Sequence, residues 1–534
     1  MKPHAVLDRL QDHRIKREIR HEIQRFEDEL ARAKLESAQH KAPVAFFNAS
    51  TRIHRLSLNG AFSLLASWAL RAVNEPVQYL VCNEGMTQCI LGWQKDRPGQ
   101  PPPCNRCMDF SNQLFPSAIA HTLHLDSSLA TKTAKLLEGK SVQDLLDWEY
   151  NGAPLGQLCL PGVRWVLRRH HLPDDENIRR LVIHYLSSSV SLYHRFIEYF
   201  NEQTPRALVI FNGILFPEAI ARWVARSMAI PTVTHEVGLR PMSAFFSHRE
   251  ATFRQLDLPT QYHLSAAQDL ELNEYLQARF EGNFSMAGIQ FWPEIEGLPG
   301  YIDDAIDSHR QTVTVFTNVI FDTSQIHANS LFSHMFEWLD VMEDVFKAHP
   351  DTLFVLRAHP DEDRPGKSSE ENVASWVLKK RIEEESNVIF ISPSDTISSY
   401  ELIRRSKFVM IYNSSIGLEA AIMGAPVLAA ARSRFTHEPT VFYPDSQQEY
   451  IASLNTFLDQ EVIDVPASFV ETARKLMYYE LFQGSLDLSQ FLKEDPTMQG
   501  MVKFQALTLG GIRDNPALNI IRDGILHGEP FLLD

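Results

Sequence analysis

Residues 410–430 read MIYNSSIGLEAAIMGAPVLAA, and this stretch decides the fold class. An apolar run ends at Tyr412, small polar residues follow, a helical pattern continues to Gly424, and a second apolar run begins after Pro426. This order is typical of a strand–helix–strand unit in a parallel sheet, whose strands are buried on both faces. Outward from this unit, we expect strands at 312–319, 352–360, 387–393, 407–415 and 425–430, and helices at 331–349, 375–386, 399–406 and 415–424.

An earlier series in the chain has the same organisation. Its expected strands are 43–50, 76–82, 207–213 and 230–238, its expected helices are 58–73 and 216–228, and 110–205 is expected to be mostly helical. The sequence therefore predicts an α/β protein with two doubly wound, Rossmann-like domains that face each other across a cleft. This architecture resembles the GT-B fold of glycosyltransferases, but a fold class alone does not establish a reaction.

These patterns divide the chain into four expected segments. A long charged helix is expected at 1–40, and its apolar stripe predicts packing across the body of its own subunit, with a coiled-coil or membrane-surface role as the alternative. A first Rossmann-like, acceptor-side domain with a helical insertion follows at 41–300, and a nucleotide-sugar-binding domain at 301–465. A helical tail is expected at 466–534.

Composition and charge exclude several classes of protein. The formal net charge of −16 argues against a surface that grips nucleic acid over its whole extent. No apolar stretch approaches the length of a spanning helix, and the first residues lack the apolar core of a signal peptide. We therefore expect a cytoplasmic protein, and a peripheral position at the inner face of the plasma membrane remains open.

The chemistry-bearing residues of the second domain lie where strands end. In open α/β sheets ligands bind outside the carboxyl ends of the strands, and a helix N-terminus there favours phosphate. A histidine can donate a hydrogen bond to phosphate, and a carboxylate one turn into the helix can accept from ribose hydroxyls. Each feature alone is explained by a cap or a turn, but together they predict a nucleotide site. Its candidate residues are Arg357, His359, Pro360, Asn413, Ser414, Ser415, Gly417 and Glu419.

The order R-x-H-P followed by Y-N-S-S-x-G-x-E-A resembles the capsule polysaccharide biosynthesis family, which includes the Kdo transferases of capsule export loci. The paired HP and SS motifs are also similar to the CMP-binding motifs of bacterial GT-B sialyltransferases and to polyol-phosphate transferases that use CDP-linked donors. The resemblance covers about residues 207–445 and is best over 311–430. It implies that His359, Ser414 and Ser415 hold the donor's nucleotide phosphate. The implied function is sugar transfer from a nucleotide donor, with a CMP-sugar favoured, to a surface-polysaccharide or glycolipid acceptor.

The first domain offers THEVG at 234–238, after an expected strand. It loosely matches the acidic motif ending in Gly that supplies the base in the sialyltransferases, here Glu236 and Gly238, with His235 in place of one acidic residue. An inverting transfer needs a group that takes the proton of the acceptor hydroxyl. We expect Glu236 to be this base and His235 its catalytic neighbour. Further cleft candidates are Asn212 and Gly213, and Asp322 is expected either to contact the donor or to be an N-cap.

Four of the five cysteines are spaced C-x6-C-x14-C-x2-C, at Cys82, Cys89, Cys104 and Cys107. Four thiolates bind Zn²⁺ tetrahedrally, and an iron–sulfur cluster also accepts four cysteines. We therefore expect a structural metal, with zinc first and iron–sulfur as the alternative. No Asp-x-Asp motif stands at a strand end, so we expect no catalytic metal.

Two other functions remain open at the level of the sequence. A sugar-nucleotide epimerase of the UDP-GlcNAc 2-epimerase type has a similar fold and a similar His-Pro after a strand. A non-catalytic nucleotide-binding scaffold in a polysaccharide-export complex is the second alternative. The sequence leaves the sugar, the acceptor and homo-oligomer formation undecided.

Overall fold

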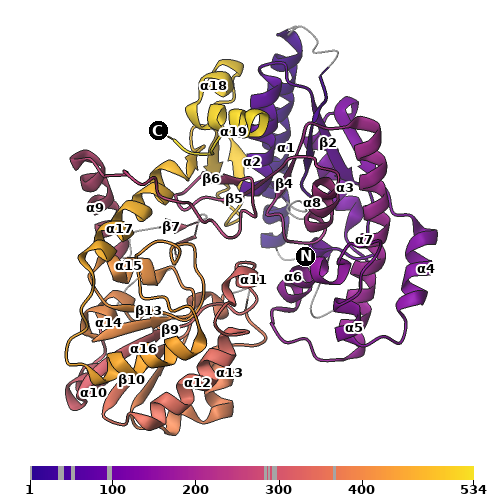
Figure 1. The fold of residues 1–534 in the computed structure, drawn as a ribbon. Coiled ribbons are helices and arrows are strands. Elements are labelled where there is room, and N and C mark those ends of the chain that lie inside the picture. Colours follow the sequence, from indigo (N-terminus) through magenta and orange to yellow (C-terminus); the bar gives the residue numbers. More distant parts are fainter. Residues whose placement is uncertain are drawn as a thin grey trace.

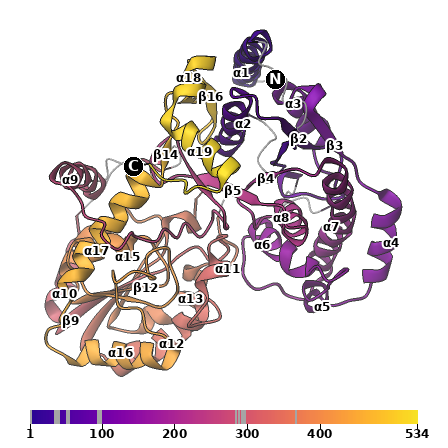
Figure 2. The same ribbon diagram turned by 45° about the horizontal axis from the view of Figure 1, so that its top comes forward.

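The computed structural model describes residues 3–33, 41–49, 55–92, 99–281, 285–286, 289–290, 297–364 and 368–533. Two α/β lobes, each built on a mainly parallel sheet, lie beside each other (Figure 1 and Figure 2). The expected fold class is therefore confirmed.

The first sheet has seven strands in the order β14-β6-β5-β4-β1-β2-β3. Strands β1 to β5 are parallel, while β6 runs antiparallel to β5 and β14 antiparallel to β6. Every residue of β4 is buried, because helices cover both faces of the sheet. The strands are β1 (Val44–Phe47), β2 (Val77–Cys82), β3 (Ala120–Leu123), β4 (Ala207–Phe211), β5 (Thr232–Val237), β6 (Ser243–Ser247) and β14 (Leu486–Asp487).

Two helical layers enclose this sheet. Helices on one face pack in one apolar core with the β15–β16 hairpin, and helices on the other face form a second core. The first layer is α1 (Pro3–Arg32), α2 (Leu58–Arg71), α3 (Cys104–Leu114), α18 (Leu509–Asp514) and α19 (Pro516–His527), with β15 (Leu492–Glu494) and β16 (Val502–Phe504). The second layer is α4 (Ser127–Leu137), α5 (Val142–Leu146), α6 (Leu155–Leu167), α7 (Glu176–Gln203) and α8 (Glu218–Ser227).

The second sheet has five parallel strands in the order β11-β10-β9-β12-β13, as the alternation in 312–430 predicts. Helices again cover both faces. The strands are β9 (Gln311–Phe316), β10 (Thr352–Arg357), β11 (Val388–Ile391), β12 (Phe408–Ile411) and β13 (Val427–Ala429). The helices are α9 (Ala266–Phe280), α10 (Gly300–Ser308), α11 (Gln325–Ala328), α12 (Met335–Ala348), α13 (Val373–Lys380), α14 (Ser399–Arg405), α15 (Ile416–Ile422), α16 (Gln447–Asp459) and α17 (Ala467–Tyr478), and the short strands β7 (Ser285–Met286) and β8 (Ile289–Gln290) form a separate pair.

The C-terminal segment connects the two lobes rather than forming a separate tail. Helix α17 packs on α15 in the second lobe, and the chain then returns to the first lobe, where β14 extends the sheet and α19 packs on α2. Figure 1 shows the yellow helices α18 and α19 beside indigo α2. Helix α9 packs against α17, so it too contacts the second lobe. The expected boundaries at 300 and 465 stay predictions, and the segments around them contribute to both lobes.

The N-terminal helix packs across its own subunit, as its apolar stripe predicts. In α1 the side chains of Ile15, Ile19, Ile23 and Phe26 are buried. Glu27 on the same helix accepts two hydrogen bonds of 2.6 Å from Arg71. Residues 34–40 of the expected 1–40 segment lie outside the described residues. Among the helices that the structure describes, none has the length and apolarity needed to cross a bilayer.

Candidate active site

A cavity of about 540 Å³ lies between the two lobes and is lined by both. The first lobe contributes the end of β5 and the loop after it, and the second contributes the ends of β10 and β12. Because all these strands are parallel members of their sheets, their carboxyl ends reach this cavity from opposite walls. Sequence candidates that line it are Asn212, Glu236, Gly238, Asp322, His359, Asn413, Ser414, Ser415 and Glu419.

Glu236 presents its carboxylate to this cavity from the first lobe. Asn59 Nδ2 donates to Glu236 Oε1 at 2.8 Å, and Asn212 Nδ2 donates to Oε2 at 3.2 Å. The backbone amide of Val237 adds a third hydrogen bond to Oε1, at 2.9 Å. These donors fix the carboxylate, while its remaining lone pairs can accept a hydroxyl proton. The geometry therefore suits a general base.

His235 does not line the cavity, and the expectation that it acts beside Glu236 is wrong. Neighbouring residues of a strand point to opposite faces, so His235 points into the core while Glu236 points to the cavity. The ring is fully buried beside Phe211 and Phe246. Neither ring nitrogen has a hydrogen-bond partner among the described residues. Burial lowers the pKa of His235 to about 3, so the side chain is neutral at physiological pH.

His359 stands on the opposite wall, directly after β10. Its Nδ1 accepts a hydrogen bond of 3.1 Å from the backbone amide of Asp361. In a neutral imidazole the other nitrogen then carries the hydrogen, so Nε2 is a donor. Burial lowers the pKa of His359, whereas Asp361 and Asp322 oppose this shift and Arg357 adds to it. A neutral, oriented hydrogen-bond donor is thus available to a phosphate oxygen.

The turn between β12 and α15 brings three polar side chains to the same wall. Asn413 Oδ1 accepts from Asn318 at 2.6 Å and from Gln325 at 3.3 Å, which fixes the start of this turn. Ser414 and Ser415 follow at the beginning of α15 and line the cavity. Both serines also line a second, smaller cavity of about 160 Å³, together with His359 and Glu419.

Gly417 and Glu419 of this motif have structural roles. Gly417 has such a role in place of ligand contact, and Glu419 has one in addition to it. A Cβ atom at Gly417 would lie 2.4 Å from Ile411 Cδ1, so this glycine permits α15 to pack closely on β12. It does not line either cavity. Glu419 lines both, but its Oε1 lies 2.7 Å from Arg279 and its Oε2 accepts from the Tyr400 hydroxyl. A ribose hydroxyl would therefore share an already paired carboxylate.

Arg357 and Pro360 line only the smaller cavity. The Arg357 side chain is buried, and it donates a hydrogen bond of 3.4 Å to the carbonyl oxygen of Asp395. Burial lowers the pKa of Arg357 to about 10, which leaves the guanidinium charged at neutral pH. The smaller cavity thus has one buried cation at the end of β10.

The remaining cleft candidates shape the backbone of its walls. Asn212 adopts a φ of 62° and accepts from the amides of Ile214 and Leu215. Gly213, with a φ of 92°, lies beside it but not in the lining. Gly238 lines the cavity, and a Cβ atom there would lie 2.2 Å from Ser243 Oγ.

Asp322 lines the cavity from the loop after β9. Its Oδ1 accepts from the amide and the hydroxyl of Ser324, at 2.8 and 2.7 Å. This carboxylate therefore stabilises its own turn, and its other oxygen remains available to a ligand. Both readings left open by the sequence, a cap and a donor contact, are compatible with this position.

Sequence reasoning missed three side chains of the site. Asn59, at the start of α2, holds Glu236, and Arg279, on α9, pairs with Glu419. Arg254 lines the cleft, where burial lowers its pKa and the nearby carboxylate of Glu236 opposes the shift. None of the three follows an expected strand, so no local signal distinguished them from surface residues.

The cleft carries more positive charge than the whole chain would suggest. Five arginines and four carboxylates line it, although the formal net charge of the chain is −16. Some of these arginines are already paired, as Arg434 is with Glu480 at 2.8 Å. The local balance still suits an anionic ligand better than the surface as a whole does.

The four clustered cysteines lie outside the cleft. All four line one small cavity at the end of β2 and the start of α3, whereas Cys159 is buried in a different place, 3.2 Å from Ser189 Oγ. The expected grouping of the four is thus present in space, and Cys159 belongs to the apolar core of the first lobe.

Comparison with known proteins shows a family match in the second lobe. Residues 300–438 match the family described as Capsule polysaccharide biosynthesis protein. The matched segment includes His359, Ser414, Ser415 and Glu419, and it confirms the resemblance inferred from these motifs. Glu236 lies outside the match, and the similarity to sialyltransferases stays a prediction. No curated protein matches the chain.

Several solved structures are similar to the chain at low scores. The Thermosulfurimonas dismutans KpsC beta Kdo 2,4 transferase is 11% identical, with a TM-score of 0.36, over 60% of this chain and 94% of that one. The beta Kdo 2,7 transferase of the same KpsC is 11% identical, with a TM-score of 0.31, over 53% of this chain and 79% of that one. The UDP-GlcNAc 2-epimerase of Neisseria meningitidis, bound to UDP-GlcNAc, is 11% identical, with a TM-score of 0.24, over 82% of this chain and 98% of that one.

Proposed function

We propose that the protein is a glycosyltransferase of capsule or related surface-polysaccharide synthesis, which moves a sugar from a nucleotide-activated donor to a hydroxyl acceptor. One observation carries this proposal: Glu236 from the first lobe, and His359, Ser414 and Ser415 from the second, line the same interlobe cavity. A base on one wall and a phosphate site on the other are the two parts that sugar transfer needs. The family match over 300–438 supports the donor side.

The donor's phosphate would lie at the junction of the two cavities. His359, Ser414 and Ser415 line both the larger cavity and the smaller one of about 160 Å³. The nucleoside would occupy the smaller cavity, and the sugar would extend into the larger one toward Glu236. The size of the smaller cavity suits a nucleoside with a one-ring base. It therefore favours a CMP-sugar over a donor that carries a purine nucleotide.

The transfer would be a single displacement that inverts the anomeric carbon. Glu236 takes the proton of the acceptor hydroxyl while the oxygen of that hydroxyl forms a bond to the anomeric carbon. The bond from the anomeric carbon to the phosphate oxygen breaks at the same time. The leaving nucleotide keeps the electron pair. His359 Nε2–H and the cleft cation Arg254 would stabilise the charge that develops on the phosphate. The hydrogen bond from His359 and the positive charge of Arg254 support a mechanism that does not require a catalytic metal.

A transfer assay distinguishes this proposal from its alternatives. Purified protein is incubated with CMP-, CDP-, UDP- and GDP-linked sugars, with and without oligosaccharide or glycolipid acceptors, and products are identified by mass spectrometry. Acceptor-dependent release of the nucleotide is the expected result. A changed sugar nucleotide without any acceptor would indicate an epimerase. Tight nucleotide binding without turnover of any donor would favour a scaffold in an export complex.

A further inference from the structure

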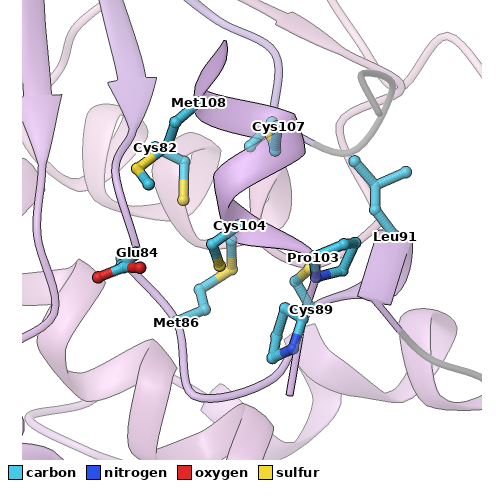
Figure 3. A pocket seen from close by; sticks show the side chains of 12 residues that line it. Cys82, Glu84, Met86, Cys89, Leu91, Pro103, Cys104, Cys107 and Met108 are labelled. Atoms are coloured by element: carbon cyan, nitrogen blue, oxygen red, sulfur yellow. The ribbon is translucent and has the colours of Figure 1, made fainter. Parts of the chain in front are cut away.

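Four of the five cysteines line one small cavity in the first lobe, and none of the residues that line it lines the interlobe cleft. Cys82 ends β2, Cys89 precedes a short 3₁₀ turn at Ile90–Gly92, and Cys104 and Cys107 lie in the first turn of α3. Figure 3 shows these side chains around one hollow, with Met86 reaching into it. The cavity holds about 30 Å³, roughly the space of one small ion or water.

Contacts that involve no sulfur hold the cysteine-bearing segments together. Thr87, between Cys82 and Cys89, is anchored to α7, because its amide donates to Ser188 Oγ at 2.9 Å. Gln88 Nε2 donates to the carbonyl oxygen of Gln100 at 3.2 Å. A Cβ atom at Gly92 would lie 2.7 Å from Pro102, so the segment after Cys89 is in direct contact with the segment before Cys104.

A reactive thiol at Cys89 does not explain this cluster. Burial raises the pKa of Cys89 to about 12, and the neighbouring thiols of Cys82, Cys104 and Cys107 add to the shift. A thiol that stays protonated at neutral pH is a poor nucleophile. No disulfide involves any of the four cysteines.

Simple apolar packing does not explain the cluster well either. Free cysteine often serves as a small apolar core residue, and Cys159 is such a case. Packing alone gives no reason for four of five cysteines to share one cavity with two thioethers, from Met86 and Met108. Sulfur-rich surroundings instead favour soft or borderline metal ions.

We propose that Cys82, Cys89, Cys104 and Cys107 bind one structural Zn²⁺ ion that ties β2, the following loop and α3 together. On binding, each S–H bond breaks, its proton passes to the solvent, and a Zn–S bond forms without any change of oxidation state. Among the described residues, no three His, Cys, Asp or Glu side chains already stand in a metal-binding arrangement. Coordination therefore requires the four thiols to shift from the positions that they have in this structure.

Metal analysis of the purified full chain tests this site. Elemental analysis should find about one zinc per chain in the wild type. The double variant C104S/C107S should lose it, whereas C159S, which changes the remaining cysteine, should keep it. Wild-type protein without zinc, or equal loss in C159S, would overturn the proposal. Iron with the absorption of a thiolate cluster would overturn the assignment of zinc.

A second measurement does not depend on the folding of any variant. Chelator-treated, reduced wild-type protein is titrated with Zn²⁺ while its thiols are counted with a chromogenic disulfide reagent. One equivalent of Zn²⁺ should protect four thiols and release protons to a weakly buffered solution. Unchanged thiol reactivity at saturating micromolar Zn²⁺ would refute the site. Neither experiment involves a sugar nucleotide, so its outcome is independent of the proposed transferase activity.

Discussion

Asn59 Nδ2 lies 2.8 Å from Glu236 Oε1, so an amide at the start of α2 positions the carboxylate that ends β5. A hydrogen bond of this kind fixes the direction of the carboxylate without neutralising it. Asn212 holds the other oxygen at 3.2 Å. Glu236 is therefore a pre-oriented group on the acceptor wall, and its function can be tested separately from that of the donor wall.

Replacing Glu236 with glutamine should remove the base and preserve the shape of the site. General-base assistance is typically worth about 10²–10⁴-fold in rate, so turnover of E236Q should fall by that factor. Donor-nucleotide affinity, measured by calorimetry, should stay nearly unchanged because the phosphate site is on the opposite wall. Turnover near that of the wild type would exclude Glu236 as the base, and an equal loss of nucleotide binding would make it structural.

Replacing His359 with alanine should weaken nucleotide binding. The variant loses one hydrogen bond to phosphate, which is worth about 1–3 kcal/mol, or about a five- to hundred-fold change in the dissociation constant. Calorimetry with CMP, CDP, UDP and GDP gives this constant. Unaltered affinity in H359A for every nucleotide that the wild type binds would remove His359 from the donor site.

The pH dependence of this binding has a defined sign. Burial lowers the pKa of His359 in the free protein, and a bound phosphate would raise it again. Affinity in the wild type should therefore increase as the pH falls from 7.5 toward the lowered pKa. H359N, titrated in parallel, corrects for protonation of the nucleotide itself. Identical pH profiles in both proteins would show that a bound phosphate does not raise the pKa of His359.

His235 should reduce stability in acid and contribute nothing to turnover. Burial lowers its pKa to about 3, so below about pH 6.5 the unfolded chain binds a proton that the folded chain does not. The free energy of unfolding should then decrease by about 1.4 kcal/mol per pH unit as pH falls below that value. In H235F the free energy of unfolding, measured by denaturant titration at pH 5.5 and 7.5, should lack this part of its dependence on pH. The turnover of H235F should equal that of the wild type. The exposed His263, changed to glutamine, serves as the control and should leave the slope unchanged.

The buried pair of Arg279 and Glu419 should stabilise the contact between α9 and α15. The two side chains are 2.7 Å apart and almost completely buried. Burial is the largest single effect and would lower the pKa of Arg279, but Glu419 together with Tyr275 and Tyr400 outweighs it, and the net shift is upward. R279M should cost about 3–5 kcal/mol, because it leaves a buried carboxylate without its partner. The double variant R279M/E419Q should recover part of this loss in the same denaturation assay, and no recovery would argue against the pair.

A histidine pair crosses the interface between the lobes. His334 Nδ1 accepts from the amide of Glu337 at 3.0 Å, so its Nε2 carries the hydrogen and donates to His171 Nε2 at 3.2 Å. His171 Nδ1 then donates to Glu371. This chain of hydrogen bonds requires both rings to be neutral, because a second proton would place two N–H groups face to face.

Acid should therefore weaken this interlobe contact. Burial lowers the pKa of His334, so its neutral form is favoured when the lobes are in contact, and this stabilisation decreases as pH falls below about 6.5. The groups around the pair are Arg164, His170, Glu337, Asp340 and Glu371. Small-angle scattering should show a larger radius of gyration at pH 5.5 than at 7.5 in the wild type. In H171N/H334Q the difference should be smaller, and an equal difference would show that other groups control it.

The sequence by itself determined all five strands of the second sheet and, in the first sheet, β1, β2, β4 and β5, with the positions of their ends. Strands β3, β6 and β14 lie outside the expected strands, and β3 interrupts a segment expected to be mostly helical. Buried parallel strands read as apolar runs, and the helices between them show their own periodicity, so both are encoded locally. For the same reason His359, Ser414 and Ser415 could be assigned to one wall, since each follows a strand of one parallel sheet. The four cysteines could be grouped because their spacing is short.

Only the tertiary structure decided which side chains meet across longer distances. Glu236 faces the cleft and His235 the core because of the register of β5, which alternation alone does not assign to either face. Asn59 reaches Glu236 across 177 residues of sequence, and Arg279 comes to Glu419 from α9. The return of the chain through β14 and α19 likewise follows from how helices dock. Such contacts depend on which faces of the helices and sheets pack against one another. The periodicity of a single segment shows which of its faces is apolar but does not specify the face that it will pack on.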